Sequence, residues 1–383
     1  MAPKDRYPWQ HPSWPNFIFD PGPSQDTVLE YTKLSREVYG GVAQLSQASM
    51  RDVAIDIMVS EALNTSEIEG EKINPENVRS SIKNYLGIGS KHEFVMDPQA
   101  EGIAALMVDV QSTLGEPLTE DTLHRWHSLI MHGEDELKLT SRGVVVGSWR
   151  VSGDPMQVVS GPIGRERVHY EAPPCAALAN EMKQFLTWYN NPSYREFEGR
   201  QPLRSAVYRA GIAHLWFECI HPYGDGNGRV GRAIVEHALG QDLGIGPLMS
   251  LSSHLNANKK SYYEALHRAS HFNLDVTDWI TYFADSVYAA QKDAQVSIDF
   301  VFRKSRFWAS HSDTHINARQ KKCLDRVFKE GPGGFSHGIS PKKYTAITQC
   351  GSATATRDLT DLVNKGVMTR TVAGRSTRYF INF

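Results

Sequence analysis

Cysteine is scarce in this sequence, and its four occurrences lie far apart, at Cys175, Cys219, Cys323 and Cys350. None of them forms a CxxC pair, so neither a zinc site nor a disulfide framework is indicated. No apolar run approaches the roughly 20 residues that a membrane helix needs, and the N-terminus lacks the apolar core of a secretory signal. The sequence therefore predicts a cytoplasmic protein with no membrane segment and four reduced thiols.

The sequence also lacks a strong net charge, because 41 Lys and Arg nearly balance 43 Asp and Glu. The balance is uneven: residues 317–383 carry twelve basic and four acidic residues. No fixed-period repeat and no low-complexity segment is present, which excludes a solenoid. With 383 residues the chain exceeds what one hydrophobic core usually organises, so we expect two or three domains.

Helical spacing of apolar residues dominates the chain and predicts a mainly α fold. The first 25 residues, rich in Pro, Trp and Phe, are expected to be extended. The predicted domains are an N-terminal segment and helical region (1–100), a central helical core (101–310) and a C-terminal domain (316–383). Predicted helices cover residues 27–85 with a stop at Gly70, 100–114, 120–132, 175–189, 203–220, 229–240 and one long stretch from 258 to about 308.

Two further patterns predict β-structure. Residues 143–160 contain β-branched residues on both sides of a Gly-Asp-Pro turn, which is typical of a hairpin. Residues 318–380 predict three helices followed by a hairpin interrupted at Gly374, which is the order of a winged-helix domain.

The basic excess of this C-terminal domain makes DNA a candidate partner. Winged helices also dock proteins, and surface Lys and Arg are often only a solvated face, so both interpretations stay open. The candidate DNA-binding residues are Thr354, Thr356 and Arg357 at the start of the third helix, with Arg370, Arg375 and Arg378 along the wing.

The most informative stretch is the loop His221–Arg232, which joins two predicted helices. Its glycines at 224, 226 and 228 allow successive backbone N–H groups to converge before a helix N-terminus, as in phosphate sites. Arg229 and Arg232 lie on one face of the following helix, where cations are unfavourable unless an anion binds. Asp225 suits a Mg²⁺ ion that bridges phosphates, and His221 suits a general base.

Other interpretations of the loop fit its residues less well. A His-Pro pair at a helix end is usually structural, and GxGxG segments are often only turns. A P-loop needs Lys and Ser or Thr after its last glycine, whereas Arg229 and Val230 follow Gly228. A Rossmann loop needs a preceding strand, and a calcium loop needs oxygen ligands where Arg229 stands.

The loop resembles the signature of the Fic family: HPF, a variable residue, Asp or Glu, GNGR, two variable residues and Arg. Tyr223 replaces the usual Phe, a conservative departure. Residues 156–160 resemble the family's flap, and the N-terminal YPWQHPSWPNF resembles a segment of bacterial members. The resemblance implies a Fic helical core with a β-hairpin flap, and transfer of AMP from ATP to a hydroxyl side chain (Ser, Thr or Tyr) of a target protein or of the protein itself.

The resemblance also assigns roles. His221 deprotonates the target hydroxyl, Asp225 binds Mg²⁺, Arg229 holds the β-phosphate and Arg232 the γ-phosphate. The anion hole comprises Gly226, Asn227 and Gly228. The flap residues Gln157, Val158, Val159 and Ser160 dock the target as an added strand, and a homodimer is the candidate assembly.

A regulator is implied by Thr65–Gly70, TSEIEG, which resembles the family's inhibitory motif: Ser or Thr, three variable residues, Glu, then Gly or Asn. Glu69 is expected to pair with Arg232 and to force ATP into an unreactive pose. The alternative is a solvated acid near a helix end, like Glu67. Some relatives with this glutamate also remove AMP, so a bifunctional enzyme that adds and removes AMP stays open, as does a DNA-binding regulator.

Overall fold

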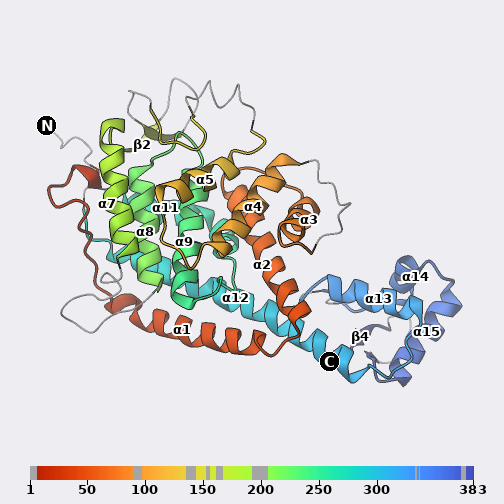
Figure 1. Cartoon of the computed structure of the whole chain (residues 1–383). Helices are drawn as coiled ribbons and strands as arrows, with labels where there is room; N and C mark the ends of the chain where they lie inside the picture. The colour runs from red at the N-terminus through yellow and green to blue at the C-terminus, as the bar shows by residue number, and fades with distance from the viewer. Residues whose placement is uncertain are drawn as a thin grey trace. The chain divides into compact units, whose positions relative to one another are not determined.

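The computed structural model describes residues 7–88, 97–134, 144–151, 156–160, 167–191, 206–271, 273–332, 334–335, 337–371 and 377–383. The chain divides into two compact units, Met1–Glu37 with Ala54–Lys292, and Val38–Val53 with Asp293–Phe383. The fold is mainly α with two small hairpins, as predicted (Figure 1). The three domain boundaries predicted from the sequence stay predictions.

Three helices lie in the N-terminal region. A segment with one 3-10 turn, Pro8–Gln10, precedes α1 (Gly22–Val42), α2 (Gln47–Ile68) and α3 (Pro75–Tyr85). Gly70 adopts a left-handed φ of 90° just beyond α2, which ends the helix where the sequence predicted. The Asn74 side chain accepts hydrogen bonds from the first N–H groups of α3 and so starts that helix.

The centre of the first unit is a pair of helices, α8 (Ala206–Ile220) and α9 (Asn227–Leu243), which pack against each other. Around them lie α4 (Pro98–Ser112), α5 (Glu120–Ile130) and α7 (Leu178–Asn190). Nearly every residue of α8 is buried, so this helix is a core element rather than a surface one. The loop between α8 and α9 is therefore held by two helices embedded in the core.

The prediction of one long helix from residue 258 to about 308 is wrong, because the structure has two helices there, α11 (Lys259–Ala269) and α12 (Thr277–Ser310). A short helix, α10 (Leu251–Ala257), precedes them. In the interruption between α11 and α12, Ile18 of the N-terminal segment exchanges backbone hydrogen bonds with Leu274 and Val276. A contact with a segment more than 250 residues away is invisible to local helical spacing, which explains the error.

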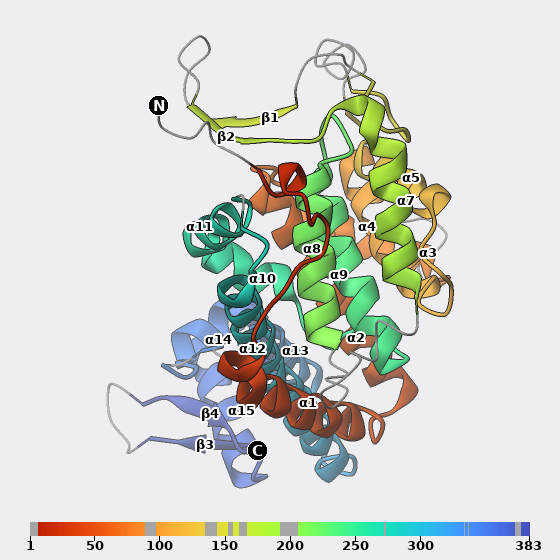
Figure 2. The same ribbon diagram turned by 90° about the vertical axis from the view of Figure 1, so that its left-hand side faces the viewer.

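The predicted hairpin exists but its position was wrong. Strand β1 (Gln157–Ser160) pairs with β2 (Arg167–Glu171) in antiparallel register, after the Gly-Asp-Pro sequence rather than around it. Residues 144–151, expected to form the first strand, form turns, and residues 152–155 lie outside the described parts. Val144 is buried in the core instead, since β propensity yields readily to tertiary context. Figure 2 shows the hairpin beyond the ends of α7 and α8.

The second unit has the predicted order of three helices and a hairpin. The helices are α13 (Ala318–Lys329), α14 (Pro341–Thr348) and α15 (Ser352–Asn364), and the strands are β3 (Met368–Arg370) and β4 (Tyr379–Ile381). A bridge between Ile339 and Tyr379 ties the hairpin to the segment before α14. Its own core includes Phe307, Leu324 and Tyr344. In the described parts of both units, every helix is too short or too polar to traverse a bilayer.

Candidate active site

The loop between α8 and α9 has an unusual backbone. His221 adopts a left-handed φ of 49°, and Gly226, the N-cap of α9, adopts 79°. A non-glycine residue in this region is strained by roughly 1 kcal/mol and persists only when its surroundings hold it. The φ of 79° favours glycine at residue 226, and a Cβ atom there would also lie 2.7 Å from the terminal methyl of Met131, which would have to shift.

Side chains brace this loop from both sides. The amide of Asn227 accepts a hydrogen bond from the Tyr223 N–H (2.9 Å) and donates one to the Tyr223 carbonyl (2.8 Å). The Tyr223 ring is buried and stacks on His127 with 4.0 Å between ring centroids. The hydroxyl that distinguishes Tyr223 from Phe lies 3.2 Å from Nδ1 of His124, so the replacement is accommodated. His127 in turn accepts from the Gly147 N–H (3.0 Å) and donates to the Asp225 carbonyl (3.2 Å).

His221 has the protonation state that a general base needs. Burial lowers its pKa to about 4, so the imidazole is neutral at pH 7. Nδ1 lies 3.4 Å from the carbonyl oxygen of Glu218 and 3.7 Å from its carboxylate. A proton on Nδ1 is held by these acceptors, which leaves the Nε2 lone pair as the basic site.

The structure brings Glu69 and Arg232 together, as predicted from the sequence. The Arg232 guanidinium donates to Oε1 of Glu69 (2.7 Å) and to the hydroxyl and carbonyl of Thr65 (2.7 and 3.0 Å), and only 3% of the side chain is exposed. A Cβ atom at residue 228 would overlap the Glu69 carboxylate. Glu69 therefore lies against the glycine backbone of the candidate anion hole.

A second acid, Glu71, was missed by the sequence reasoning. Its carboxylate lies 2.6 and 2.8 Å from one terminal nitrogen of Arg229, whose side chain is 6% exposed. Burial raises the pKa of Glu71, and Arg229 opposes that rise. The signal was available: Glu67, Glu69 and Glu71 alternate around the end of α2, and two buried arginines need two acids. Glu67 faces elsewhere and accepts from Asn256.

The residues present fit a magnesium–polyphosphate group. The carboxylates of Glu71 and Glu69 occupy the places at Arg229 and Arg232 where phosphate groups would bind. The buried Nε of Arg229 has no hydrogen-bond partner among the residues that the structure describes. Asp225 accepts from the Gly226 N–H (2.6 Å) and adds one carboxylate beside the same backbone. One carboxylate plus phosphate oxygens is the donor set that Mg²⁺ prefers. Across the described ranges no three His, Cys, Asp or Glu residues cluster as metal ligands, so the phosphates would have to complete that set.

The flap is anchored to the same loop. The Tyr170 hydroxyl, on β2, donates to the Cys219 carbonyl (2.7 Å), two residues before His221. Among the described residues, β1 pairs only with β2, so its other edge offers unpaired backbone groups. Docking of a target along the predicted residues Gln157–Ser160 stays a prediction.

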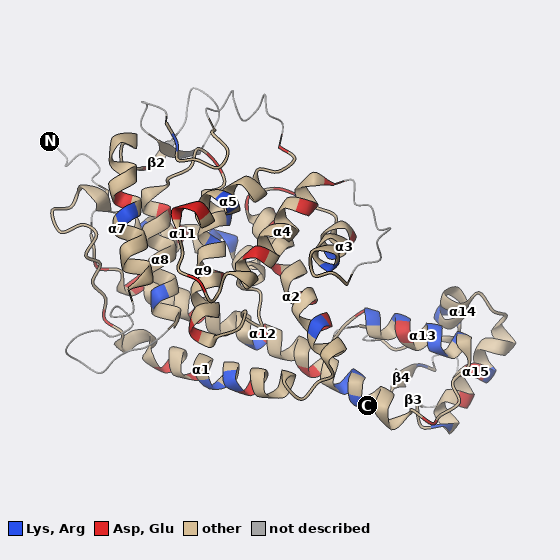
Figure 3. Ribbon diagram, viewed as in Figure 1, with Lys and Arg blue, Asp and Glu red and all other residues tan. Residues whose placement is uncertain are grey.

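The candidate DNA-binding residues are partly placed. Thr356 and Arg357 are exposed in the second turn of α15, Thr354 is half-buried, Arg370 is exposed on β3 and Arg378 is half-buried; Arg375 lies outside the described residues. Figure 3 shows basic and acidic residues interleaved along α13. All four acids of residues 317–383 form ion pairs with basic neighbours, Asp325 with Lys321, Glu330 with Arg326, Asp358 with Arg319 and Asp361 with Lys365.

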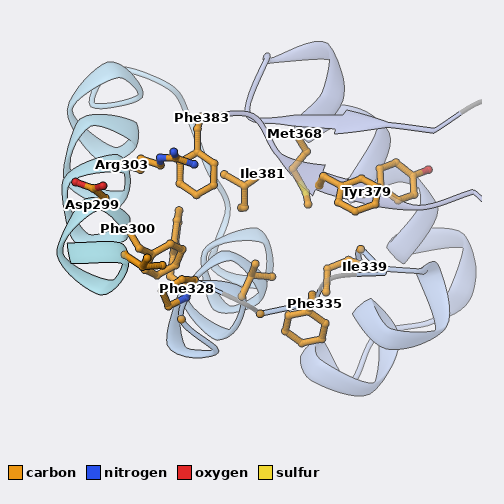
Figure 4. A pocket seen from close by; sticks show the side chains of 17 residues that line it. Asp299, Phe300, Arg303, Phe328, Phe335, Ile339, Met368, Tyr379, Ile381 and Phe383 are labelled. Carbon is orange, nitrogen blue, oxygen red and sulfur yellow. The ribbon is translucent and has the colours of Figure 1, made fainter. Parts of the chain in front are cut away.

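The second unit also contains an apolar cavity of about 370 Å³. Figure 4 shows aromatic side chains around it, with Asp299 and Arg303 at one side. Phe300, Phe328 and Phe383 line it together with the hairpin residues Met368 and Ile381. It has no part in the loop chemistry above.

A family model matches the part of the chain that contains this loop. Residues 117–239 match the family model "Fic/DOC family", and residues 7–88 match "Domain of unknown function (DUF4172)". A Fic domain containing signaling protein from Bacteroides thetaiotaomicron is 17% identical over 72% of this chain and 97% of that one, with a TM-score of 0.50. Fic-1 from C. elegans is 18% identical over 72% and 73%, also at 0.50. A Fic family protein from Desulfovibrio desulfuricans is 16% identical over 93% and 95%, at 0.49.

Proposed function

Because the chain belongs to the Fic/DOC family, we propose that it is an autoinhibited protein adenylyltransferase, which transfers AMP from ATP to a hydroxyl side chain of a target protein or of itself. Members of this family are commonly transferases. The observation that carries the proposal is the loop itself: a neutral, half-buried histidine, a glycine backbone and two buried arginines occupied by carboxylates.

The proposed reaction uses these groups in order. His221 Nε2 takes the proton of the target hydroxyl as its oxygen bonds to the α-phosphorus of ATP. The bond from that phosphorus to the bridging oxygen breaks, and pyrophosphate leaves with the bonding pair. Backbone N–H groups at residues 226–228 and the guanidinium groups of Arg229 and Arg232 stabilise the phosphate charge. Bound Mg²⁺ would supply further charge neutralisation beside Asp225.

Inhibition follows from the same contacts. The γ-phosphate must displace Glu69 from Arg232, and the β-phosphate must displace Glu71 from Arg229. A bidentate Arg–phosphate contact and an Arg–carboxylate contact use the same donors, so nucleotide and acid compete. We therefore extend the inhibitory role predicted for Glu69 to Glu71.

The test uses purified protein, Mg²⁺ and ATP labelled at the α-phosphate. Wild type is compared with Glu69→Gly and with the double variant Glu69→Gly, His221→Ala, and label on protein is measured. We expect strong labelling of the single variant and a loss of about 10²- to 10⁴-fold in the double variant. Full labelling without His221 would refute the proposal.

Two alternatives can be read from the same samples. If label on the Glu69→Gly protein is lost when wild-type protein is added, but is kept when more Glu69→Gly protein is added, the enzyme also removes AMP, with Glu69 orienting water. The DNA-regulator alternative draws on the second unit, where the acids are all paired with basic neighbours. It gains support if the single variant stays unlabelled while the full chain binds duplex DNA.

A further inference from the structure

Arg150 is a buried cation that no part of the proposed reaction uses. Only 4% of the residue is exposed, and burial lowers its pKa. Within the described parts of the chain, no Asp or Glu forms an ion pair with it. A buried guanidinium without a carboxylate is costly unless several hydrogen bonds satisfy its donors, so the contacts that it makes indicate its role.

These contacts converge on the strained loop. The side-chain Nε of Arg150 donates to the His221 carbonyl (2.9 Å), and the backbone N–H of Arg150 donates to the Pro222 carbonyl (2.9 Å). The two bonds hold consecutive carbonyls at the point where His221 adopts its left-handed φ of 49°. Since such a backbone reverts unless its surroundings hold it, Arg150 is the side chain best placed to keep the imidazole where it is.

The other donors of the same guanidinium reach the base of the flap. One terminal nitrogen donates to the Pro173 carbonyl and the other to the Cys175 sulfur (3.1 Å). Pro173 follows Ala172, whose N–H continues the hairpin ladder by donating to Met156 (2.9 Å). A rigid planar fork can hold three acceptors at once, whereas a lysine ammonium on its flexible stem cannot reproduce that geometry.

We infer that Arg150 is a positioning residue that fixes the spacing between the flap, where the target chain docks, and His221, which must meet the target hydroxyl. This inference rests on the proposed function. Displacing a reacting group by about 1 Å costs roughly 10²-fold in rate, so a loosened clamp weakens transfer even when nucleotide binding is intact. Arg150 contacts neither the arginines nor the glycines of the phosphate site, so the affinity for ATP is expected to stay the same.

The test compares Arg150→Lys and Arg209→Lys, each in the Glu69→Gly background. Arg209 is the control, because it is also buried in the same unit and donates to the Ala238 carbonyl (2.7 Å), to Gln241 (3.0 Å) and to Asp242 (3.2 Å), away from the loop. We measure the labelling rate at saturating Mg·ATP, the KM for ATP and the melting temperature. Arg150→Lys is expected to lower the rate about 10- to 100-fold with an unchanged KM, whereas Arg209→Lys lowers only the melting temperature.

Hydrogen exchange of the same variants gives a second measurement that needs no activity. Arg150→Lys is expected to speed exchange in peptides covering both residues 167–175 and 219–224, and Arg209→Lys in neither. Equal labelling by Arg150→Lys and its parent, an equal loss in Arg209→Lys, or unchanged exchange would each overturn the inference. If the Glu69→Gly parent carries no label, the proposed function fails, and exchange alone decides whether Arg150 joins the two segments.

Discussion

The N-terminal two turns of α9 and α15 offer a direct comparison. Both helices have a glycine N-cap, Gly226 and Gly351, without a side-chain capping bond, and both carry Arg near the start. At α9 the arginines are buried and occupied by acids from a distant segment; at α15 Arg357 is exposed. Burial makes a charge depend on one specific partner, whereas an exposed charge is screened by water and salt. Under the proposed function, the buried pairs at α9 form a switchable site, whereas an exposed arginine such as Arg357 would attract anions without selecting one partner.

The largest expected effect is on stability at acid pH. Burial lowers the pKa of His127, His221 and His237 to about 4 and that of His214 to about 3, all in the first unit. As pH falls below about 6.5 the unfolded chain binds protons that the folded chain refuses, so stability is lost between about pH 6.5 and 4. We expect a loss on the order of a few kcal/mol, seen as a falling melting temperature.

Two acids with raised pKa values oppose this loss of stability, because they stabilise the folded chain more as the pH falls. Burial raises the pKa of Glu218 to about 8, and burial reinforced by Glu61 raises that of Glu236. Their contribution to stability is complete at low pH and is lost as pH rises above the ordinary carboxyl range. Below pH 6.5 the four histidines outnumber these two acids, so the net effect is a loss of stability. Glu236→Gln removes a carboxyl group that is costly to ionise, so it should raise the melting temperature at pH 8 but not at pH 4. A melting temperature that rises steadily from pH 6.5 to 4 would contradict the expectation that the buried histidines of the first unit resist protonation.

A smaller effect is expected at Arg229. Glu71→Gln removes the charge that competes with phosphate but keeps the side-chain shape, so Mg·ATP should bind about 10-fold more tightly, or about 1.4 kcal/mol. Isothermal titration calorimetry measures this directly. Glu67→Gln is the matched control, because Glu67 accepts from Asn256 and faces no arginine of the loop. Equal affinities for Glu71→Gln and wild type would mean that the Arg229 pair is only structural.

The smallest expected effect is at α15. If this surface binds DNA, Arg357→Ala in the full chain should weaken binding to a labelled duplex about 2- to 5-fold and lower the salt slope by about 1. Lys321→Ala is the control with the same charge change, since Lys321 on α13 pairs with Asp325 (2.8 Å). Equal effects of the two variants would show that only net charge matters, and absence of salt-dependent binding would favour protein docking.

Much of the fold was predictable because its signals are local. The stop at Gly70, the start of α13 near Ala318 and the helix–helix–helix–hairpin order all follow from spacing, caps and breaks within a few residues. The hairpin and the long helix were misplaced where distant segments decide the backbone. Val144 is buried rather than extended in a strand, and Ile18 pairs across the break before α12.

By itself, the sequence predicted the chemistry of the loop. Glycine spacing, helix periodicity and the resemblance to the Fic signature together indicate which residues between His221 and Arg232 would act as base, as metal ligand and as hydrogen-bond donors to phosphate. The resemblance predicted that Glu69 pairs with Arg232, but only the tertiary structure decided that Glu71 meets Arg229 and that Arg150 joins the loop to the flap. Glu71 and Arg229 are 158 residues apart, and Arg150 and His221 are 71 apart. Such contacts depend on how the helices pack, and no local pattern in the chain encodes that packing.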